Sequence, residues 1–140
     1  MKTQLSPKTR IIFPLDFPNL KEARRFVRLL KNDIGVFKIG LELFVSEGTN
    51  IIRMVKKEGK AKIFLDMKFH DIPETVRRAC SSAVKHGVDF ITVHAEGGGS
   101  LLKSVVEISG NTKILAITVL TSLSKKDLKE IGIKNDLQDP

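Results

Sequence analysis

Short apolar runs alternate along the chain with longer segments in which apolar residues recur every three or four positions. Short runs bounded by turn residues are typical of buried strands, and the wider spacing is typical of helices with one apolar face. Strands are predicted at residues 11–16, 36–40, 61–65, 89–94 and 113–120. Helices are predicted at residues 20–30, 51–58, 74–86, 101–106 and 125–131. The pattern therefore predicts that strand and helix alternate along the whole chain.

Capping residues mark where helices begin. Asn19, followed three residues later by Glu22, predicts a capping box at the start of the first helix. Ser100, which follows a glycine-rich loop, is predicted to cap the fourth helix. The apolar residues 41–44 are predicted to continue the second strand into a loop, and the polar residues 1–9 to form a loose arm.

Strand–helix units with short connections predict a parallel sheet with right-handed crossovers. The length suits one α/β domain over residues 1–140 with a substantial core. Residues able to carry chemistry fall at or just after the carboxyl ends of the predicted strands, and these are Asp16, Lys38, Asp66, Lys68, His94 and Thr121. Both closed (β/α)₈ barrels and open α/β sheets place their sites at this edge, so the pattern alone leaves the two architectures open.

The composition of the chain favours some classes of binding partner over others. The chain is 41% hydrophobic and 29% charged, as globular domains are, and its net charge of +8 favours anionic partners such as phosphorylated small molecules. Trp and Tyr are absent, so a base-stacking platform for nucleic acid is not predicted. Residues 114–120 form the longest apolar segment, which is too short to span a membrane. A single cysteine, Cys80, and a basic N-terminus without a signal-peptide apolar stretch fit a cytoplasmic protein.

Three charged residues mark the place where the third strand gives way to a helix. Asp66 and Lys68 share one face of that strand because side chains alternate, and Asp71 follows on the loop. Burying charge is costly unless it is paired, so an alternating array of these residues with Lys38 predicts a site that holds the Lys68 ammonium group. The alternative is a surface ion-pair cluster that contributes little to stability.

Two other features suggest ligands only weakly. His70 and His94 lack the i, i+4 spacing of paired metal ligands, so structural histidines are predicted and no metal is expected. The run Gly97-Gly98-Gly99 precedes a helix and could cradle a phosphate group, although a tight loop is the simpler interpretation.

Residues 66–76 match a known signature. The sequence Asp-Met-Lys-Phe-His-Asp-Ile-Pro-Glu-Thr-Val resembles the Asp-x-Lys-Phe-His-Asp-Ile-Pro-x-Thr-Val motif of the orotidine 5'-phosphate decarboxylase family. The resemblance implies a (β/α)₈ TIM barrel, of which this chain supplies about five strands with their helices. It therefore implies a truncated barrel that lacks the later segments holding the substrate phosphate.

The resemblance also implies a reaction and a set of roles. Orotidine 5'-phosphate would lose CO₂ to give UMP in pyrimidine biosynthesis, without a cofactor. Lys68 would stabilise and protonate the C6 carbanion, Asp66 would face the departing carboxylate, and Asp16 and Lys38 would bind the ribose hydroxyl groups. The remaining contacts would come from Asp71, Ile72 and Thr75, reaching the site of a partner subunit in a homodimer, and from Thr121 and Ser124 beside the pyrimidine.

Other functions stay open at this stage. A sugar-phosphate decarboxylase or aldolase of the same superfamily would share Asp-x-Lys-x-x-Asp, although Phe69-His70 and Ile72-Pro73 favour the pyrimidine enzyme. The 140-residue chain alone is expected to be inactive and to associate through open strand edges, because the phosphate-binding part is missing. A basic nucleic-acid-binding module is the least favoured alternative.

Overall fold

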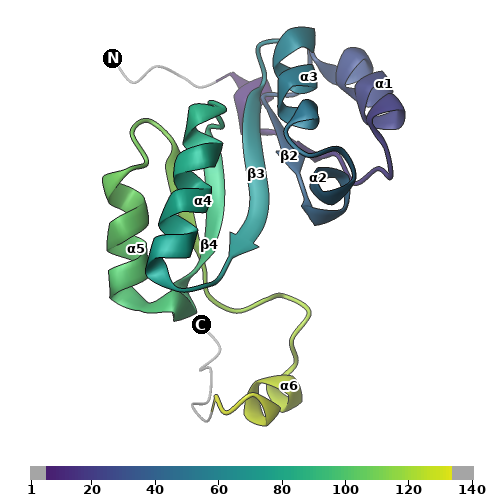
Figure 1. The fold of residues 1–140 in the computed structure, drawn as a ribbon. Helices are drawn as coiled ribbons and strands as arrows, with labels where there is room; N and C mark the ends of the chain where they lie inside the picture. Colours follow the sequence, from purple (N-terminus) through teal and green to yellow (C-terminus); the bar gives the residue numbers. More distant parts are fainter. Residues whose placement is uncertain (1–5, 134–140) are drawn as a thin grey trace.

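The computed structural model describes residues 6–133 and contains one parallel sheet (Figure 1). Its strands lie in chain order, β1-β2-β3-β4-β5, and every neighbouring pair is parallel. They are β1 (Ile12–Pro14), β2 (Val36–Ile39), β3 (Lys62–Phe69), β4 (Phe90–His94) and β5 (Lys113–Ile117). The predicted α/β class and the five parallel strands are confirmed, although β3 runs four residues further than predicted, to Phe69, and β5 ends earlier, at Ile117.

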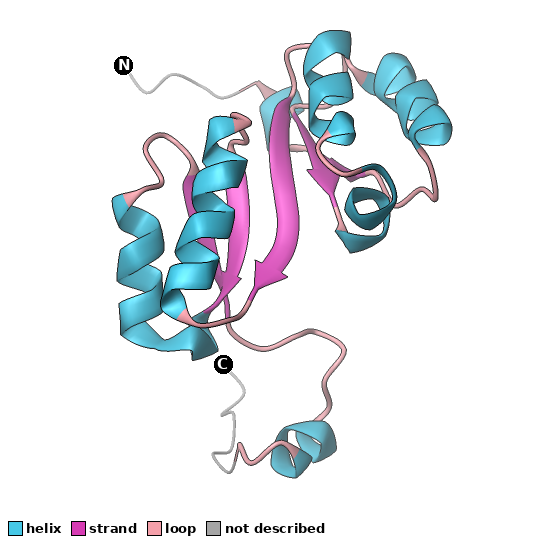
Figure 2. Cartoon of the chain, viewed as in Figure 1, coloured by secondary structure: helices cyan, strands magenta, loops and turns pink. Residues whose placement is uncertain are grey.

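Helices follow every strand, as Figure 2 shows. The α-helices are α1 (Leu20–Leu30), α2 (Leu41–Glu47), α3 (Asn50–Glu58), α4 (Pro73–Lys85), α5 (Gly98–Glu107) and α6 (Lys125–Glu130). Short 3₁₀ turns precede β1 and α5, namely η1 (Pro7–Arg10) and η2 (Ala95–Gly97). No helix among the described residues is long and apolar enough to cross a membrane.

The core lies between one face of the sheet and the helices. Alternate strand residues point into it and are almost inaccessible to solvent, among them Phe37, Ile63, Leu65, Ile91 and Val93. Val27, Ile51, Val76 and Leu101 on the helices meet them. Each fully buried side chain of this size contributes about 1.5–3 kcal/mol through the hydrophobic effect. This packing holds the strands, and therefore the polar residues at their ends, in a fixed register.

The opposite face of the sheet carries the charged residues and a few aromatic ones. Phe64 and Phe90 meet edge to face across β3 and β4, with ring centroids 6.0 Å apart. Leu115 of β5 is 38% exposed on the strand next to them. Within the described chain, this face is much less covered than the helix-packed face.

Several sequence-based predictions are wrong in detail. Residues 41–44 belong to helix α2 rather than to a loop, because Gly40 ends β2 and its backbone starts a helix directly. Helix α5 begins at Gly98, so Ser100 lies inside it and does not cap it. The arm predicted for residues 1–9 contains part of the turn η1, and residues 1–5 lie outside the described part. At α1 only half of the capping box forms. The Asn19 side chain accepts a hydrogen bond from the Glu22 backbone N–H. The Glu22 carboxylate accepts from the Asn19 side chain, whereas a complete box would have it accept from the Asn19 backbone N–H.

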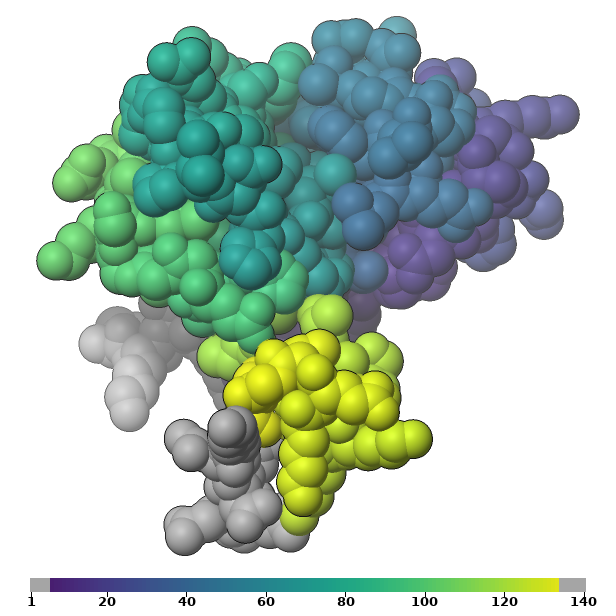
Figure 3. Space-filling view, turned by 60° about the horizontal axis from the view of Figure 1, so that its bottom comes forward, coloured from purple at the N-terminus to yellow at the C-terminus, as the bar shows by residue number. Residues whose placement is uncertain are grey.

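Helix α6 stands apart from the sheet. A long connection after β5 carries it beyond the carboxyl ends of the strands (Figure 1), and Figure 3 shows it projecting from the rest of the surface. Ser124 and Asp127 form a complete capping box at its start. This motif satisfies backbone groups at the start of α6, and Leu128 of the same helix is buried at 5% exposed.

Candidate active site

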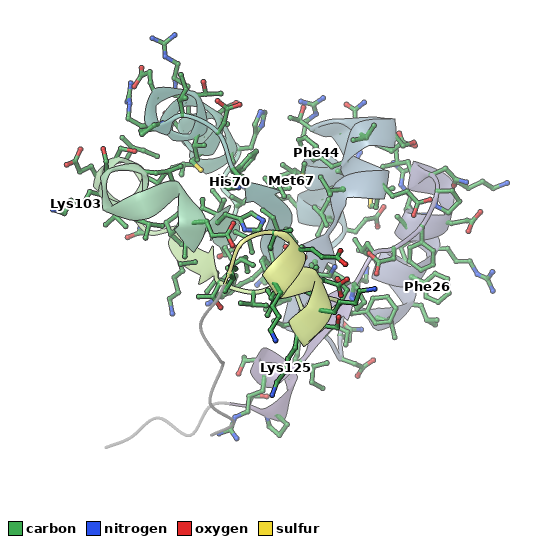
Figure 4. The ribbon with its side chains drawn as sticks, turned by 90° about the horizontal axis from the view of Figure 1, so that it is seen from below. Phe26, Phe44, Met67, His70, Lys103 and Lys125 are labelled. Carbon is green, nitrogen blue, oxygen red and sulfur yellow. The ribbon has the colours of Figure 1, made fainter. Side chains whose placement is uncertain are left out.

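Charges of alternating sign meet at the carboxyl ends of the first three strands. The Lys68 Nζ atom lies 2.9 Å from Asp66 Oδ1, and the Lys38 Nζ atom lies 3.4 Å from Asp66 Oδ2. Asp16, just after β1, extends the row through a 3.7 Å contact with Lys38. We call these four residues the charged array. Figure 4, which views the molecule from this end, shows Met67, the β3 residue between Asp66 and Lys68, near the centre.

The sequence dictates this proximity in two ways. The parallel register places Pro14 beside Lys38 and Lys38 beside Phe64, so the strand ends lie at one edge. Gly40 then leaves room for the array, because a Cβ atom there would lie 3.3 Å from Asp16 Oδ1 and 3.8 Å from Lys38 Nζ.

Strand β3 is irregular where it carries the array. Leu65 pairs with Ile91, but the next β3 residue in the ladder is Phe69, which pairs with Val93. Three residues, 66–68, therefore face a single β4 residue, and we call this stretch the β3 bulge. Lys68 has a φ of 49° within it, in the left-handed region that non-glycine residues rarely adopt. Strain of this kind concentrates at functional sites.

Thr92 joins the array, although sequence analysis did not select it. Its hydroxyl group donates to Asp66 Oδ1 at 3.0 Å and accepts from the Lys68 backbone N–H at 2.8 Å. Only 1% of Thr92 is exposed. The available signal was a polar residue inside the apolar run of residues 90–93, next to the strand that bears Asp66.

Asp66 is ionised by its surroundings. Burial, which leaves 12% of its side chain exposed, would raise the pKa of this carboxyl group. Hydrogen bonds from Lys68 and Thr92 and the positive charges of both lysines outweigh burial, so the pKa lies below its usual value. The array therefore holds a carboxylate between two ammonium groups, and it can stabilise negative charge and deliver a proton from Lys68.

The structure does not join Asp71 to the array. Asp71 is exposed, and its carboxylate accepts from the Ile72 N–H at 2.6 Å; it makes no ion pair within residues 6–133. Ile72, which is 67% exposed, and Thr75 also face solvent at the start of α4. These three residues form an exposed group beside the site rather than part of it.

Thr121 and Ser124 lie on the connection to α6. Both are exposed, and the Ser124 hydroxyl group is engaged in the capping box with Asp127. Hydrogen bonds from Ser124 lower the pKa of the Asp127 carboxyl group. The described contacts do not bring either residue to the charged array.

Two histidines that are distant in the sequence come together at the same end of the sheet. The rings of His70 and His94 stack with centroids 5.1 Å apart, and possible ligand atoms of these residues and Glu96 lie within 4.8 Å of one another. Spacing along the sequence could not reveal this cluster because its members follow different strands. The buried His94 Nδ1 atom has no hydrogen-bond partner within the described part of the chain. These side chains are of types that can bind a metal ion, whereas the charged array offers two lysines that would repel one. That the two histidines are structural stays a prediction.

The glycine run before α5 forms a tight connection. Gly97 ends η2, and a Cβ atom there would lie 2.5 Å from the Leu101 side chain. Gly98 has a φ of 79°, which glycine adopts without strain. These glycines are therefore required by close packing and backbone conformation.

Comparison with known proteins agrees with this geometry. The profile of the Orotidine 5'-phosphate decarboxylase / HUMPS family matches residues 9–139. The chain belongs to this family. An orotidine 5'-phosphate decarboxylase of Desulfosudis oleivorans is 46% identical over 129 residues, which cover 91% of this chain and 52% of that protein. The relative from Methylacidiphilum infernorum is also 46% identical, over 91% of this chain and 56% of its own length.

Solved structures give the same result. The orotidine 5'-phosphate decarboxylase of Lactobacillus acidophilus superposes with a TM-score of 0.81 at 35% identity, covering 89% of this chain and 60% of that one. An uncharacterized conserved protein of Geobacillus kaustophilus has a TM-score of 0.83 at 33% identity, covering 90% of this chain and 62% of its own. The chain thus spans just over half the length of the curated relatives it matches, and it is the five-stranded part of a TIM-barrel fold.

Proposed function

We propose that this chain forms part of an orotidine 5'-phosphate decarboxylase, which converts orotidine 5'-phosphate to UMP in pyrimidine biosynthesis without a cofactor. The observation that carries the proposal is the ion pair between Lys68 and Asp66 at 2.9 Å, on a strained bulge of β3 in a member of this family. Relatives of this name match over about nine tenths of the chain.

The charges of the array fit the chemistry. Decarboxylation breaks the bond between C6 and the carboxylate group, CO₂ leaves, and the electron pair stays on C6. The Lys68 ammonium group would stabilise that carbanion and then transfer a proton from Nζ to C6. Asp66 would hold Lys68 in place and face the departing carboxylate group.

The other proposed contacts surround this centre. Asp16 and Lys38, which lie 3.7 Å apart at the end of the array, would bind the ribose hydroxyl groups. Thr121 and Ser124 would contact the pyrimidine, which requires the connection to α6 to approach the array. These roles follow from the family signature and are proposals for this chain.

A homodimer would explain the exposed position of Asp71. We propose that Asp71, Ile72 and Thr75 reach the active site of a second copy, in a cytoplasmic enzyme. Mixing Lys68→Ala and Asp71→Asn variants of a complete barrel, the chimera described below, tests this, because hybrid dimers would regain one intact site out of two. Activity that stays at the level of the separate variants would exclude a shared site.

The substrate can be tested in a complete barrel. A chimera joins residues 1–140 to the C-terminal part of the Desulfosudis oleivorans relative, beyond the matched region. We expect it to release CO₂ from orotidine 5'-phosphate and to produce UMP, measured by the change in pyrimidine absorbance and by chromatography. Turnover of a 3-keto sugar phosphate with no turnover of orotidine 5'-phosphate would contradict the proposal and favour the sugar-phosphate enzymes of the superfamily.

A further inference from the structure

We propose that Thr92 is a positioning residue for Lys68 and Asp66: its hydroxyl group holds the Lys68 backbone and the Asp66 carboxylate in a single arrangement. The inference rests on the proposed decarboxylase function, because it assigns a support to the groups that would act there. Thr92 itself would not touch the reacting atoms, since both of its polar contacts are to protein groups.

The β3 bulge creates the need for such a residue. Residues 66–68 face Thr92 alone, so the ladder between β3 and β4 offers Lys68 no regular backbone acceptor. The Lys68 N–H donates to Thr92 Oγ1 at 2.8 Å instead. A side-chain hydroxyl group thus takes the place of a ladder carbonyl, and it does so where Lys68 has the unusual φ of 49°.

The direction of the two hydrogen bonds couples the backbone of Lys68 to the charge of Asp66. A backbone N–H can only donate, so Thr92 must accept from Lys68 and has its one proton free for Asp66 Oδ1. The same Oδ1 atom accepts from Lys68 Nζ. Asp66 therefore receives hydrogen bonds from the side chain of Lys68 and from the group that holds the backbone of Lys68.

Burial makes the hydroxyl group hard to replace. Thr92 is 1% exposed, and its neighbours Ile91 and Val93 are fully buried, so water cannot readily take over its two hydrogen bonds. Valine has nearly the same shape and lacks the hydroxyl group. In a Thr92→Val protein the Lys68 N–H would lose its acceptor and Asp66 one donor, which frees the bulge to relax.

The charged groups around Asp66 determine how its carboxyl pKa should respond to Thr92→Val. Lys68 lies on its own strand, Lys38 on β2, and Asp16 beyond Lys38 at the end of β1. Because these charges stay in Thr92→Val, the carboxyl group should remain ionised at neutral pH. Its pKa should nevertheless rise measurably, because one of the hydrogen bonds that favour the charged form is gone.

Three variants in the chimera separate positioning from general stability. Thr92→Val removes the hydroxyl group, and Thr92→Ser keeps it. Thr112→Val is the matched control, because Thr112, just before β5, is also buried and its hydroxyl group donates one hydrogen bond, to the carbonyl of Val88 just before β4 at 2.8 Å. All three are compared with the parent chimera at equal temperature and protein concentration.

Two measurements are made on each protein. The first follows the Asp66 carboxyl carbon by NMR during a pH titration, with assignment by an Asp66→Asn variant, together with exchange of the Lys68 amide proton. The second determines kcat and KM for orotidine 5'-phosphate.

We expect Thr92→Val to raise the Asp66 pKa and to speed exchange of the Lys68 amide proton. We also expect kcat to fall by about 10- to 100-fold with a smaller change in KM, because a loss of this size is the usual cost of a misplaced reacting group.

The controls decide the outcome. Thr92→Ser should stay close to the parent in every readout, and Thr112→Val should lower thermal stability without changing kcat or the Asp66 titration. An unchanged kcat and titration in Thr92→Val, or an equal loss in Thr92→Ser, would overturn the proposal. If the parent chimera does not decarboxylate orotidine 5'-phosphate, the proposed function fails, and the titration and amide exchange still decide whether Thr92 holds the array.

Discussion

Asp66 lies between two lysines, and this arrangement sets the charge state of the site. Opposite unit charges about 4 Å apart attract by about 4 kcal/mol at an effective dielectric constant of 20. This attraction adds to the hydrogen bonds from Lys68 and Thr92, and together they outweigh the partial burial of the carboxylate, so its pKa is lowered. With its pKa lowered, Asp66 stays negative throughout the neutral range. It contributes to stability above the pKa that an unfolded aspartate would have, and this contribution is lost as the pH falls through the lower folded value.

The thiol group of Cys80, which lies outside the charged array, should be protected from reagents in the folded protein. It is fully buried in α4, and burial raises the pKa of its thiol group from 9.0 to about 11. The folded state therefore binds the proton more tightly, and stability contributed by Cys80 is lost as the pH rises from about 9 to about 11. We expect the native chimera to react slowly at this position with a dithiobis-nitrobenzoate reagent and rapidly in urea, with Cys80→Ala as the reference. Rapid reaction of native Cys80 at neutral pH would contradict this packing.

Residues differ in how far the sequence alone reveals their roles. Lys38, Asp66 and Lys68 are predictable because charges inside apolar runs need a physical reason. Thr92 is not, since threonine is common in strands and its role depends on the β3 bulge. The stacking of His70 on His94 was equally hidden, because it depends on how two strand ends lie side by side.

Secondary-structure elements were predictable in type and order, and less so at their boundaries. The spacing of apolar residues indicates all five strands, because short apolar runs and helix-type spacing are both clear in this sequence. The sequence does not indicate helix α2, because the apolar residues 41–44 continue the composition of β2 and no side-chain cap marks the change at Gly40. The start of α5 is hard to predict for a related reason, since Gly97 occupies the cap position without a side chain.

The irregular end of β3 links element geometry to chemistry. A regular strand would place residues 66 and 68 on one face and pair each of them with β4. The bulge keeps the two side chains within 2.9 Å of one another while turning the Lys68 backbone into the left-handed region. A strained element at this point supports the interpretation that its conformation is selected for the site.

At the scale of the whole molecule, one face of the sheet is packed by helices and the other carries the array. Within residues 6–133, Ile12 on β1 and Leu115 on β5 are 49% and 38% exposed, and each lies on an outermost strand. The chain matches just over half of each of these relatives, 52% and 56%, and the substrate-binding residues proposed here come from only that part of their length. Complete activity is therefore best tested in a complete barrel.

The most direct measurement of the central claim is the rate at which the chimera and its Lys68→Ala variant decarboxylate orotidine 5'-phosphate. Lys103→Ala is the matched control, because Lys103 is an exposed lysine on α5, away from the centre of the view in Figure 4. Lys68→Ala should abolish detectable turnover without loss of the folded state, since Lys68 supplies the charge and the proton, and Lys103→Ala should act like the parent. Appreciable decarboxylation by folded Lys68→Ala would contradict the account.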